Sequence, residues 1–399
     1  MSLVLRTLLL TACLWLVTGL SAEAASCGSP AIDHAAAKVR EARVALGALP
    51  IYENSGPTSL TPQAQAVISE MKARLRDFLD AYMRCLPSNF DTASTQDDLG
   101  QRFAQREVEP IGPVHYGDHL TFTMQRPAGH PDLVAVTANF AIECGTDTVL
   151  FLFSSEGGSW TEILRWQSRP YPEINGAFAS FSYGVSPPDE SGHWFVVTKT
   201  VAPWCSSTWS VIRYSVLRPR ADRVTPRVIY DAEDPIWWGG EDFGRLNVDR
   251  DSFDLRFHAD SIDLGIHSRL WIRHFAVEGD EVRRVAPIAL SPRDFVDEWM
   301  TSPWNQASSW SKTEARPALK SWHERLQALR PTEYYEYGAI QRCGDGTARY
   351  QVELKADDPD GDVYLRLEGS PSAFDMIAVA AKPDPRCGGP DLLDSMATQ

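Results

Sequence analysis

One segment of this chain occurs three times in succession, with a period of about 60 residues. Each copy consists of a short apolar run, a polar stretch and a second apolar run. The first runs are residues 132–137, 193–198 and 252–257, and the second runs are residues 149–153, 211–214 and 270–275. This period suits a unit of about four short strands that stacks on its neighbours. The sequence therefore predicts a mainly β fold with three antiparallel repeats of about 60 residues.

The polarity of the first runs indicates how the repeats are covered. In the first two repeats both faces of this strand are apolar, as Val134 and Ala135 illustrate. A strand that is apolar on both faces is covered on both faces. The third repeat alternates apolar residues with Asp254, Arg256 and His258, which predicts one wet face, as in the outermost unit of an open stack. A sandwich and a small propeller-like ring completed by C-terminal strands both fit, since closed propellers have at least four blades.

The first 25 residues have the features of an export signal. Arg6 provides the positive start, residues 8–20 form an apolar core, and residues 22–24 match the small-x-small cleavage pattern. Residues 10–13 resemble a lipoprotein cleavage box, but the apolar core continues beyond them. No other stretch reaches about 18 uninterrupted apolar residues. We therefore expect a periplasmic or extracellular protein without a membrane span.

The cysteines fit an oxidising compartment. Removal of the signal takes away Cys13 and leaves six of the seven cysteines. An even number in an exported chain is typical of disulfides, whereas a metal site needs closely spaced cysteines. Six cysteines allow about 15 pairings, and we select the one that joins cysteines within a module or at matching repeat positions. The predicted bonds are Cys27–Cys85, Cys144–Cys205 and Cys343–Cys387.

Helix-start signals divide the remainder of the chain. Ser29 and Thr61 each precede a proline, and a capping residue before a proline is a strong sign of a helix start. Three further proline-led starts lie between residues 291 and 317. The predicted order is signal peptide 1–25, N-terminal helical hairpin 26–90, linker 91–114, repetitive β domain 115–291, helical segment 292–330, C-terminal antiparallel strands 331–388 and tail 389–399. The last two structured parts together form a C-terminal α+β segment.

The net charge disfavours two classes of partner. The chain carries a formal charge of −15, which the loss of Arg6 and Glu23 with the signal leaves unchanged. Nucleic acids and anionic lipid surfaces require basic surfaces. The composition therefore argues against both.

Motifs for catalysis are absent from the sequence. It contains no nucleophile elbow, no phosphate-binding loop and no dinucleotide fingerprint. His323 and Glu324 begin like a zinc-protease helix, but Gln327 stands where the second histidine is required. All six mature cysteines are assigned to disulfides, which leaves no thiol nucleophile. The sequence thus favours a protein that is not an enzyme and predicts no cofactor.

His115, Asp118 and His119 form the densest group of potential metal ligands. Two imidazoles and a carboxylate at this spacing could bind zinc. However, Gly117 and Asp118 also make an ordinary hairpin turn, and a short histidine pair without further ligands is unspecific. The aspartates of residues 357–362 resemble a calcium loop only superficially, because the glycine is misplaced and the bidentate glutamate is missing. We therefore assign no metal site.

The connection between the second and third repeats combines carboxylates with two tryptophans. The residues concerned are Trp237, Trp238, Glu233, Asp234, Glu241 and Asp242. Indole faces can stack on sugar rings while carboxylates bind hydroxyl groups or act as acid and base. Alternatively, the tryptophans fill the gap between two β units and the carboxylates are solvated, since large aromatic side chains usually pack in cores.

Two functional hypotheses follow. The first is an exported, disulfide-stabilised β-repeat protein that binds a carbohydrate or peptide ligand, or a partner, at the cell envelope or outside it. The second is a secreted hydrolase that acts on glycosides with carboxylates near Trp237 and Trp238. Two carboxylates about 5–10 Å apart beside an exposed tryptophan would favour the enzyme.

Overall fold

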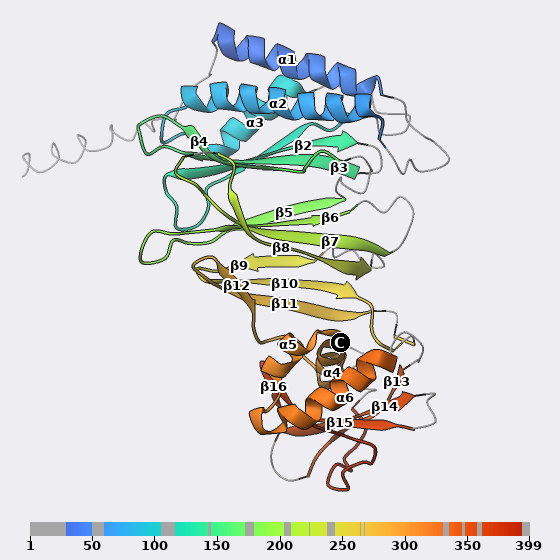
Figure 1. Cartoon of the computed structure of the whole chain (residues 1–399). Coiled ribbons are helices and arrows are strands. Elements are labelled where there is room, and N and C mark those ends of the chain that lie inside the picture. The colour runs from blue at the N-terminus through green and yellow to red at the C-terminus, as the bar shows by residue number, and fades with distance from the viewer. Residues whose placement is uncertain are drawn as a thin grey trace, which may run out of the picture.

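The computed structural model describes residues 29–49, 60–104, 116–142, 145–171, 179–202, 209–222, 224–237, 244–263, 265–266, 268–329, 335–344, 348–356 and 361–392. The predicted signal peptide lies outside these residues. Three N-terminal helices, three sheets, a helical segment and a fourth sheet follow one another along an elongated stack (Figure 1). None of the described helices combines the length and the apolar character that crossing a bilayer requires.

The described strands form four antiparallel sheets of four strands each, in which every strand pairs with its neighbour in the sequence. The first sheet contains β1 (Thr121–Gln125), β2 (Leu133–Ile142), β3 (Gly145–Ser154) and β4 (Thr161–Gln167), and the second contains β5 (Ser180–Val185), β6 (Val196–Val201), β7 (Trp209–Arg218) and β8 (Arg227–Trp237). The third contains β9 (Arg245–Val248), β10 (Ser252–Ala259), β11 (Arg269–Glu278) and β12 (Glu281–Arg284), and the fourth contains β13 (Tyr335–Arg342), β14 (Arg349–Ala356), β15 (Val363–Ser370) and β16 (Ala373–Ala380).

The predicted fold class is confirmed. The three first apolar runs lie in, or lead directly into, β2, β6 and β10, and the three second runs lie in β3, β7 and β11. Each repeat is therefore one four-stranded sheet, and the repeated runs form its two central strands. The sheets made by the described strands stack openly and do not close into a ring (Figure 1).

Three apolar layers hold the stack together, and β2 and β6 each contribute to two of them. Val134 faces the N-terminal helices, whereas Ala135 faces the second sheet. Val196 faces the first sheet and Val197 faces the third. All four side chains are fully buried. This alternation explains why the runs are apolar on both strand faces.

The wet face predicted for the third repeat is present, with one exception. His258 is exposed and Arg256 is half-buried, whereas β2 and β6 are buried almost throughout. Asp254 differs from the expectation because it is buried. Its Oδ2 accepts a hydrogen bond from Arg256 Nε at 2.8 Å, and His274 Nδ1 lies 3.8 Å from its Oδ1. Local partners thus let this carboxylate turn away from solvent.

The N-terminal hairpin consists of α1 (Pro30–Gly47) and α2 (Pro62–Cys85). The side chains of Ser29 and Thr61 accept hydrogen bonds from the backbone amides three residues later, at 3.3 and 3.1 Å, as the helix-start signals predicted. Apolar residues of both helices share one buried core with the first sheet. The hairpin therefore covers the outer face of the stack at its N-terminal end (Figure 1).

A third helix, α3 (Thr92–Phe103), lies where the sequence predicted a linker over residues 91–114. Asp91 caps it by accepting a hydrogen bond from the amide three residues later at 2.7 Å. Leu99 and Phe103, which lie one helical turn apart, are buried. The cap and this apolar pair were visible in the sequence, but the polar composition of the segment concealed them.

The C-terminal part contains α4 (Pro292–Thr301), α5 (Trp304–Ala307) and α6 (Arg316–Leu329) together with the fourth sheet. Buried residues of these helices and of β13 to β16 form a separate apolar core that includes Trp299 and Leu365. The helices thus cover one face of the fourth sheet, as an α+β arrangement requires.

One predicted disulfide is confirmed. Cys343 and Cys387 are bonded, with Cα atoms 3.8 Å apart, which is closer than the common range of about 4.4–6.8 Å. Cys85 is also disulfide-bonded, but its predicted partner Cys27 lies outside the described residues. Cys144 and Cys205 lie outside them as well, so these two bonds remain predictions.

Candidate functional site

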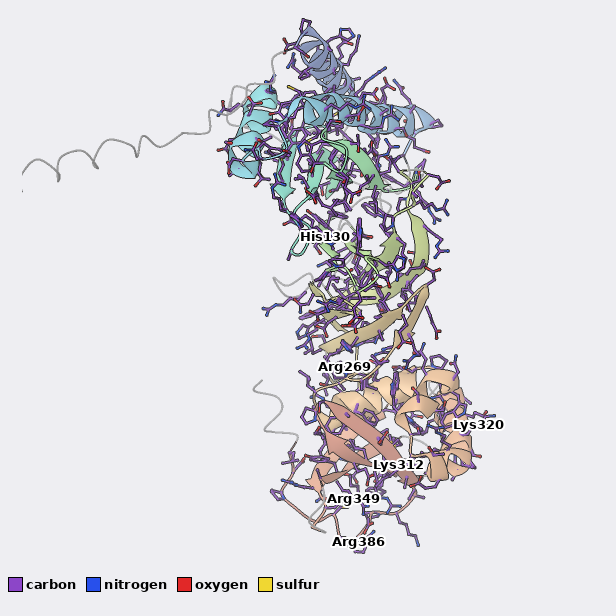
Figure 2. The ribbon with its side chains drawn as sticks, turned by 90° about the vertical axis from the view of Figure 1, so that its left-hand side faces the viewer. His130, Arg269, Lys312, Lys320, Arg349 and Arg386 are labelled. Carbon is purple, nitrogen blue, oxygen red and sulfur yellow. A yellow bond between two sulfur atoms is a disulfide. The ribbon has the colours of Figure 1, made fainter. Side chains whose placement is uncertain are left out.

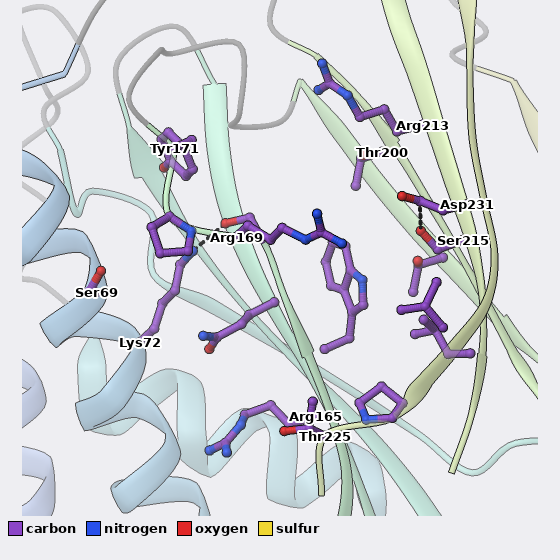
Figure 3. Close-up of a pocket in the computed structure, with 18 of the residues that line it drawn as sticks. Ser69, Lys72, Arg165, Arg169, Tyr171, Thr200, Arg213, Ser215, Thr225 and Asp231 are labelled. Atoms are coloured by element: carbon purple, nitrogen blue, oxygen red, sulfur yellow. Dashed lines mark hydrogen bonds between the residues drawn. The ribbon is translucent and has the colours of Figure 1, made fainter. Parts of the chain in front are cut away.

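A cleft of 790 Å³ lies beside β4, the edge strand of the first sheet, where it faces the second sheet (Figure 3). One wall is formed by residues 65–76 of α2 and another by residues 165–171 at the end of β4. The third wall is formed by side chains of β6, β7 and β8. We refer to this space as the interlayer cleft.

The wall formed by the second sheet is polar. Thr198 and Thr200 of β6 line it together with Ser215 of β7 and the carboxylates Asp231 and Glu233 of β8. Asp231 and Glu233 are two residues apart and therefore lie on the same face of their strand. Ser215 Oγ donates a hydrogen bond to Asp231 Oδ1 at 2.6 Å (Figure 3). The wall thus offers hydroxyl groups and carboxylates to a ligand.

On the opposite side of the cleft, α2 is held to the first sheet by a buried ion pair. Lys72 Nζ lies 2.6 Å from Asp147 Oδ2, and the two side chains are 5% and 0% exposed. Asp147 also accepts hydrogen bonds from Ser168 Oγ at 3.2 Å and from Tyr171 OH at 3.0 Å. Burial, with the charge of Asp147, raises the pKa of Tyr171 well above its usual value, so this phenol remains a neutral donor.

Ser168 and Lys72 have the residue types of a serine–lysine nucleophile pair. Lys72 Nζ also donates a hydrogen bond to Ser168 Oγ. However, an ammonium group that is paired with a buried carboxylate is not available as a base, and the Ser168 proton is directed at Asp147. This cluster therefore anchors α2 and shapes the cleft, and it does not activate a nucleophile.

The cleft is rich in cations. Five basic side chains line it, and only two acidic ones do; the basic residues are Lys72, Arg76, Arg165, Arg169 and Arg213. Lys72 is neutralised by Asp147, and Arg165 Nε lies 3.5 Å from Glu162 Oε1. Arg213 Nε donates to Glu233 Oε2 at 3.2 Å, in a pair whose side chains are 40% and 66% exposed. Arg169 is exposed and has no ion-pair partner among the described residues.

The structure separates the predicted site residues of β8. Glu233 faces the interlayer cleft, and strand alternation places the half-buried Trp237 on the same face. Asp234 faces the third sheet, where its oxygens accept two hydrogen bonds from Arg273 at 2.8 and 2.9 Å. Tyr214 OH donates to it at 2.8 Å. Glu233 and Asp234 therefore cannot act together on one ligand.

Only some of the remaining predicted site residues lie within the described part of the chain. Trp238, Glu241 and Asp242 lie outside the described residues, so the tryptophan-and-carboxylate site remains a hypothesis. His115 lies outside them too. His119 is exposed and Asp118 half-buried, in a turn that starts with Tyr116 and Gly117 and precedes β1.

A second charged cluster joins the third sheet to α4 and is fully enclosed. Glu298 lies 3.1 Å from Arg269, 2.9 Å from Arg273 and 2.8 Å from Arg284. Arg269 Nε also lies 2.9 Å from Asp297 Oδ1, although these two atoms are not aligned as a hydrogen bond. Figure 2 shows Arg269 at the junction between the third sheet and the C-terminal helices. Because these side chains are at most 8% exposed, the cluster is part of the architecture and not a ligand site.

The sequence did not identify most of the residues that line the cleft. Asp147, Arg169 and Arg213 are distant from one another in the chain, and no local pattern marks them. Lys72 is different, because it interrupts an otherwise apolar helix stripe between Ile68 and Leu75. A lysine at such a position needs a buried partner, and this was the one available signal.

Comparison with protein-family models finds no match, and comparison with curated proteins finds none either. Among solved structures, the α-L-arabinofuranosidase Arb93A from Fusarium graminearum in complex with an iminosugar inhibitor is 8% identical, with a TM-score of 0.26 over 70% of this chain and 71% of that one. The α-L-arabinofuranosidase PaAbf62A from Podospora anserina in complex with cellotriose is 13% identical, with a TM-score of 0.21 over 70% and 72%.

The catalytic domain of a GH62 α-L-arabinofuranosidase from Coprinopsis cinerea is 10% identical, with a TM-score of 0.19 over 71% of this chain and 73% of that one. At such low TM-scores and identities, these likenesses support no conclusion about the activity of this chain.

Proposed function

We propose that this protein is an exported ligand-binding protein and that the interlayer cleft is its binding site. The observation that supports the proposal is the cleft itself, whose 790 Å³ falls in the range of about 300–1,000 Å³ typical of ligand pockets. Export is supported by the signal-like first 25 residues and by the disulfide between Cys343 and Cys387.

The walls of the cleft are held in place by contacts within the protein. The Lys72–Asp147 pair fixes α2 against the first sheet. The amide of Arg165 in β4 donates to the carbonyl of Val224 at 2.8 Å, which ties the edge of the first sheet to the connection before β8. A site that is already ordered loses less conformational entropy when a ligand binds.

The lining of the cleft favours a hydroxyl-rich ligand such as an oligosaccharide. The hydroxyl groups of Thr198, Thr200, Ser215 and Thr225 can exchange hydrogen bonds with sugar hydroxyls. Trp166 is half-buried at the same cleft, and aromatic faces stack on the CH groups of sugar rings. An apolar ligand would leave this polar lining unsatisfied.

Filling the cleft is expected to abolish binding. A panel of neutral and acidic oligosaccharides is tested by thermal shift; a ligand at a hundred times its dissociation constant stabilises a protein by about 2.7 kcal/mol. Ser215→Trp places an indole in the cleft and should remove this stabilisation. Asn247→Trp, at an exposed position of β9, is the matched control and should retain it. A folded Ser215→Trp variant that binds as well as the wild type would contradict the proposed site.

A glycoside hydrolase is a second candidate, favoured by one observation. Asp231 and Glu233 both line the cleft from the same face of β8, with Cα atoms about 6.6 Å apart along the strand. Side chains at this Cα spacing can place their carboxyl groups about 5–9.5 Å apart, the separation that glycosidases use. In this hypothesis one residue is the general acid and the other is the base or nucleophile, a role for which each must leave its present partner, Ser215 or Arg213.

The enzyme hypothesis predicts that Asp231→Asn and Glu233→Gln each lower the hydrolysis of an oligosaccharide by at least about a hundredfold, since general acid–base catalysis contributes that much or more. The measurement is the release of reducing ends over a substrate panel. A wild-type protein that binds a saccharide but releases no reducing ends would favour the binding protein over the enzyme.

A further inference from the structure

The charge of the interlayer cleft contrasts with that of the whole chain. The chain carries a formal charge of −15, yet five basic and two acidic side chains line the cleft. An acidic protein repels anions over most of its surface, so a local excess of arginines changes which ligands can approach this cleft.

Two of the five cations are placed to contact a ligand. Lys72 and Arg165 are held by carboxylates of the first sheet, and Arg76 lies beside the exposed Asp77. Arg169 is exposed and has no ion-pair partner in the part of the chain that the structure describes. Arg213 pairs with Glu233, whose side chain is 66% exposed and can turn into solvent when an anion binds.

Arg169 and Arg213 approach the cleft from different walls. Figure 3 shows Arg169 extending from the end of β4 and Arg213 extending from the second sheet, with the cleft between them. A guanidinium group is a rigid fork of donors that matches the oxygens of carboxylate, phosphate or sulfate. Thr200, which pairs with Arg213 across the sheet, adds a hydroxyl donor beside it, whereas the Ser215 hydroxyl donates to Asp231.

From this placement we infer that the interlayer cleft binds a ligand with an oxyanion group, which Arg169 and Arg213 contact from the two sides. The inference rests on the proposed function, because it specifies the ligand class of the same site. The carboxylate of an acidic saccharide and a free or esterified phosphate share this chemistry. In either case the anion contacts Arg213 in place of Glu233, and no covalent bond is formed or broken.

The test uses isothermal titration of the full mature chain with three probes: trigalacturonate, the neutral galactose trimer and inorganic phosphate. We expect trigalacturonate to bind and the neutral trimer to bind at least about tenfold more weakly, because a hydrogen bond to a charged group is worth roughly 1.5–3 kcal/mol. Arg169→Met and Arg213→Met should each weaken trigalacturonate binding by about tenfold or more. Arg250→Met, at an exposed arginine in the turn after β9, should leave it unchanged.

The salt dependence provides a second measurement on the same samples. Trigalacturonate binding should weaken as sodium chloride is raised, and the Arg169→Met variant should show a smaller dependence, because one screened ion pair is lost. Melting temperatures identify any variant that fails to fold. Arg169 is exposed, so its substitution is expected to leave the melting temperature essentially unchanged.

The outcomes separate this inference from the proposed function. Binding of phosphate in competition with trigalacturonate supports the inference and identifies phosphate as a second source of the anion. Equal binding of the neutral and acidic trimers, unaffected by Arg169→Met, overturns the inference and leaves the cleft as a binding site for neutral saccharides. Absence of binding by trigalacturonate and phosphate also overturns it, and the neutral panel with Ser215→Trp then decides the proposed function.

Discussion

Replacing Glu298 with glutamine is expected to destabilise the protein by about 3–5 kcal/mol, the loss that follows when one partner of a buried ion pair is removed. Glu298 is the counter-charge of three buried arginines. Arg273 retains Asp234 and Arg269 retains Asp297, but Arg284 is left without a carboxylate partner among the described residues. The measurement is the free energy of unfolding in urea.

Glu278→Gln is the matched control for this variant. Glu278 lies 3.5 Å from Arg283, and both side chains are largely exposed, so the change should stay within about 0.5 kcal/mol of the wild type. If Glu298→Gln lowered the free energy of unfolding no more than this control does, the ion pairs of the cluster would not be what holds α4 to the third sheet.

The stability of the wild type and that of the Glu298→Gln variant should depend differently on pH. Burial alone would raise the pKa of Glu298, but the charges of Arg273, Arg284 and Arg269 outweigh it and hold this pKa well below its usual range. A carboxylate with a lowered pKa in the folded state stabilises the protein above its unfolded pKa of about 4.3 and ceases to do so as the pH falls. The difference between wild type and Glu298→Gln should therefore be largest near pH 7 and shrink below about pH 4.

Adjacent in the sequence, Asp297 responds in the opposite direction. Its burial outweighs the charge of Arg269 and raises its pKa. Ionised Asp297 therefore destabilises the folded state near neutral pH, and this destabilisation decreases as the pH falls and the carboxylate is protonated. Substitution of Asp297 should for this reason change the pH dependence with a sign opposite to that of Glu298→Gln.

The repeats could be predicted from the sequence because their signal is local. The apolar runs that form β2, β6 and β10 are continuous in the chain. In the first two runs both strand faces are apolar, and this pattern predicts a packed layer on each side of the sheet. The number of sheets in the stack could not be predicted in the same way. Whether four sheets close into a ring depends on how each is rotated against the next, and no single run of residues encodes that rotation.

The helix α3 shows the limit of composition as a guide. Its residues 92–103 are mostly polar, so composition alone predicts a linker, although Asp91 is a good cap and Leu99 and Phe103 share a face. A helix with one narrow apolar edge is stabilised by the surface it packs on. For α3 this surface is formed by β1 and α2, which lie outside the segment, so the segment alone does not reveal it.

The candidate site was predicted in part, for a reason that lies in strand geometry. The sequence selected Glu233 and Trp237, which do lie on the cleft face of β8, but it grouped them with Asp234, which lies on the other. Neighbouring residues of a strand point to opposite faces, so a cluster that is dense in sequence is divided in space. Asp231 lies two residues before Glu233, just as Pro235 lies two residues before Trp237. A search for residues with the strand period of two would therefore have selected Asp231.

Lys72→Met is expected to destabilise the protein by about 3–5 kcal/mol, because it leaves the wholly buried Asp147 with two hydroxyl donors, the Thr148 amide and no cation. Methionine has nearly the length of lysine and lies on a helix face that is otherwise apolar, so packing alone should change little. Lys38→Met is the control, since Lys38 pairs with Glu41 at the surface of α1. The measurement is again urea unfolding.

The double variant Lys72→Met/Asp147→Asn distinguishes loss of the ion pair from loss of packing. If the large effect of Lys72→Met arises from an unpaired buried carboxylate, then removing that charge as well should recover a substantial part of the stability, and the coupling energy between the two sites should exceed about 1 kcal/mol. If the losses of unfolding free energy in the two single variants simply added up in the double variant, each side chain would stabilise the protein through its own separate contacts. In that case the pair would not be what holds α2 against the first sheet, and the cleft wall built on it would have to be held by the apolar core of Met71, Leu75 and Phe78 alone.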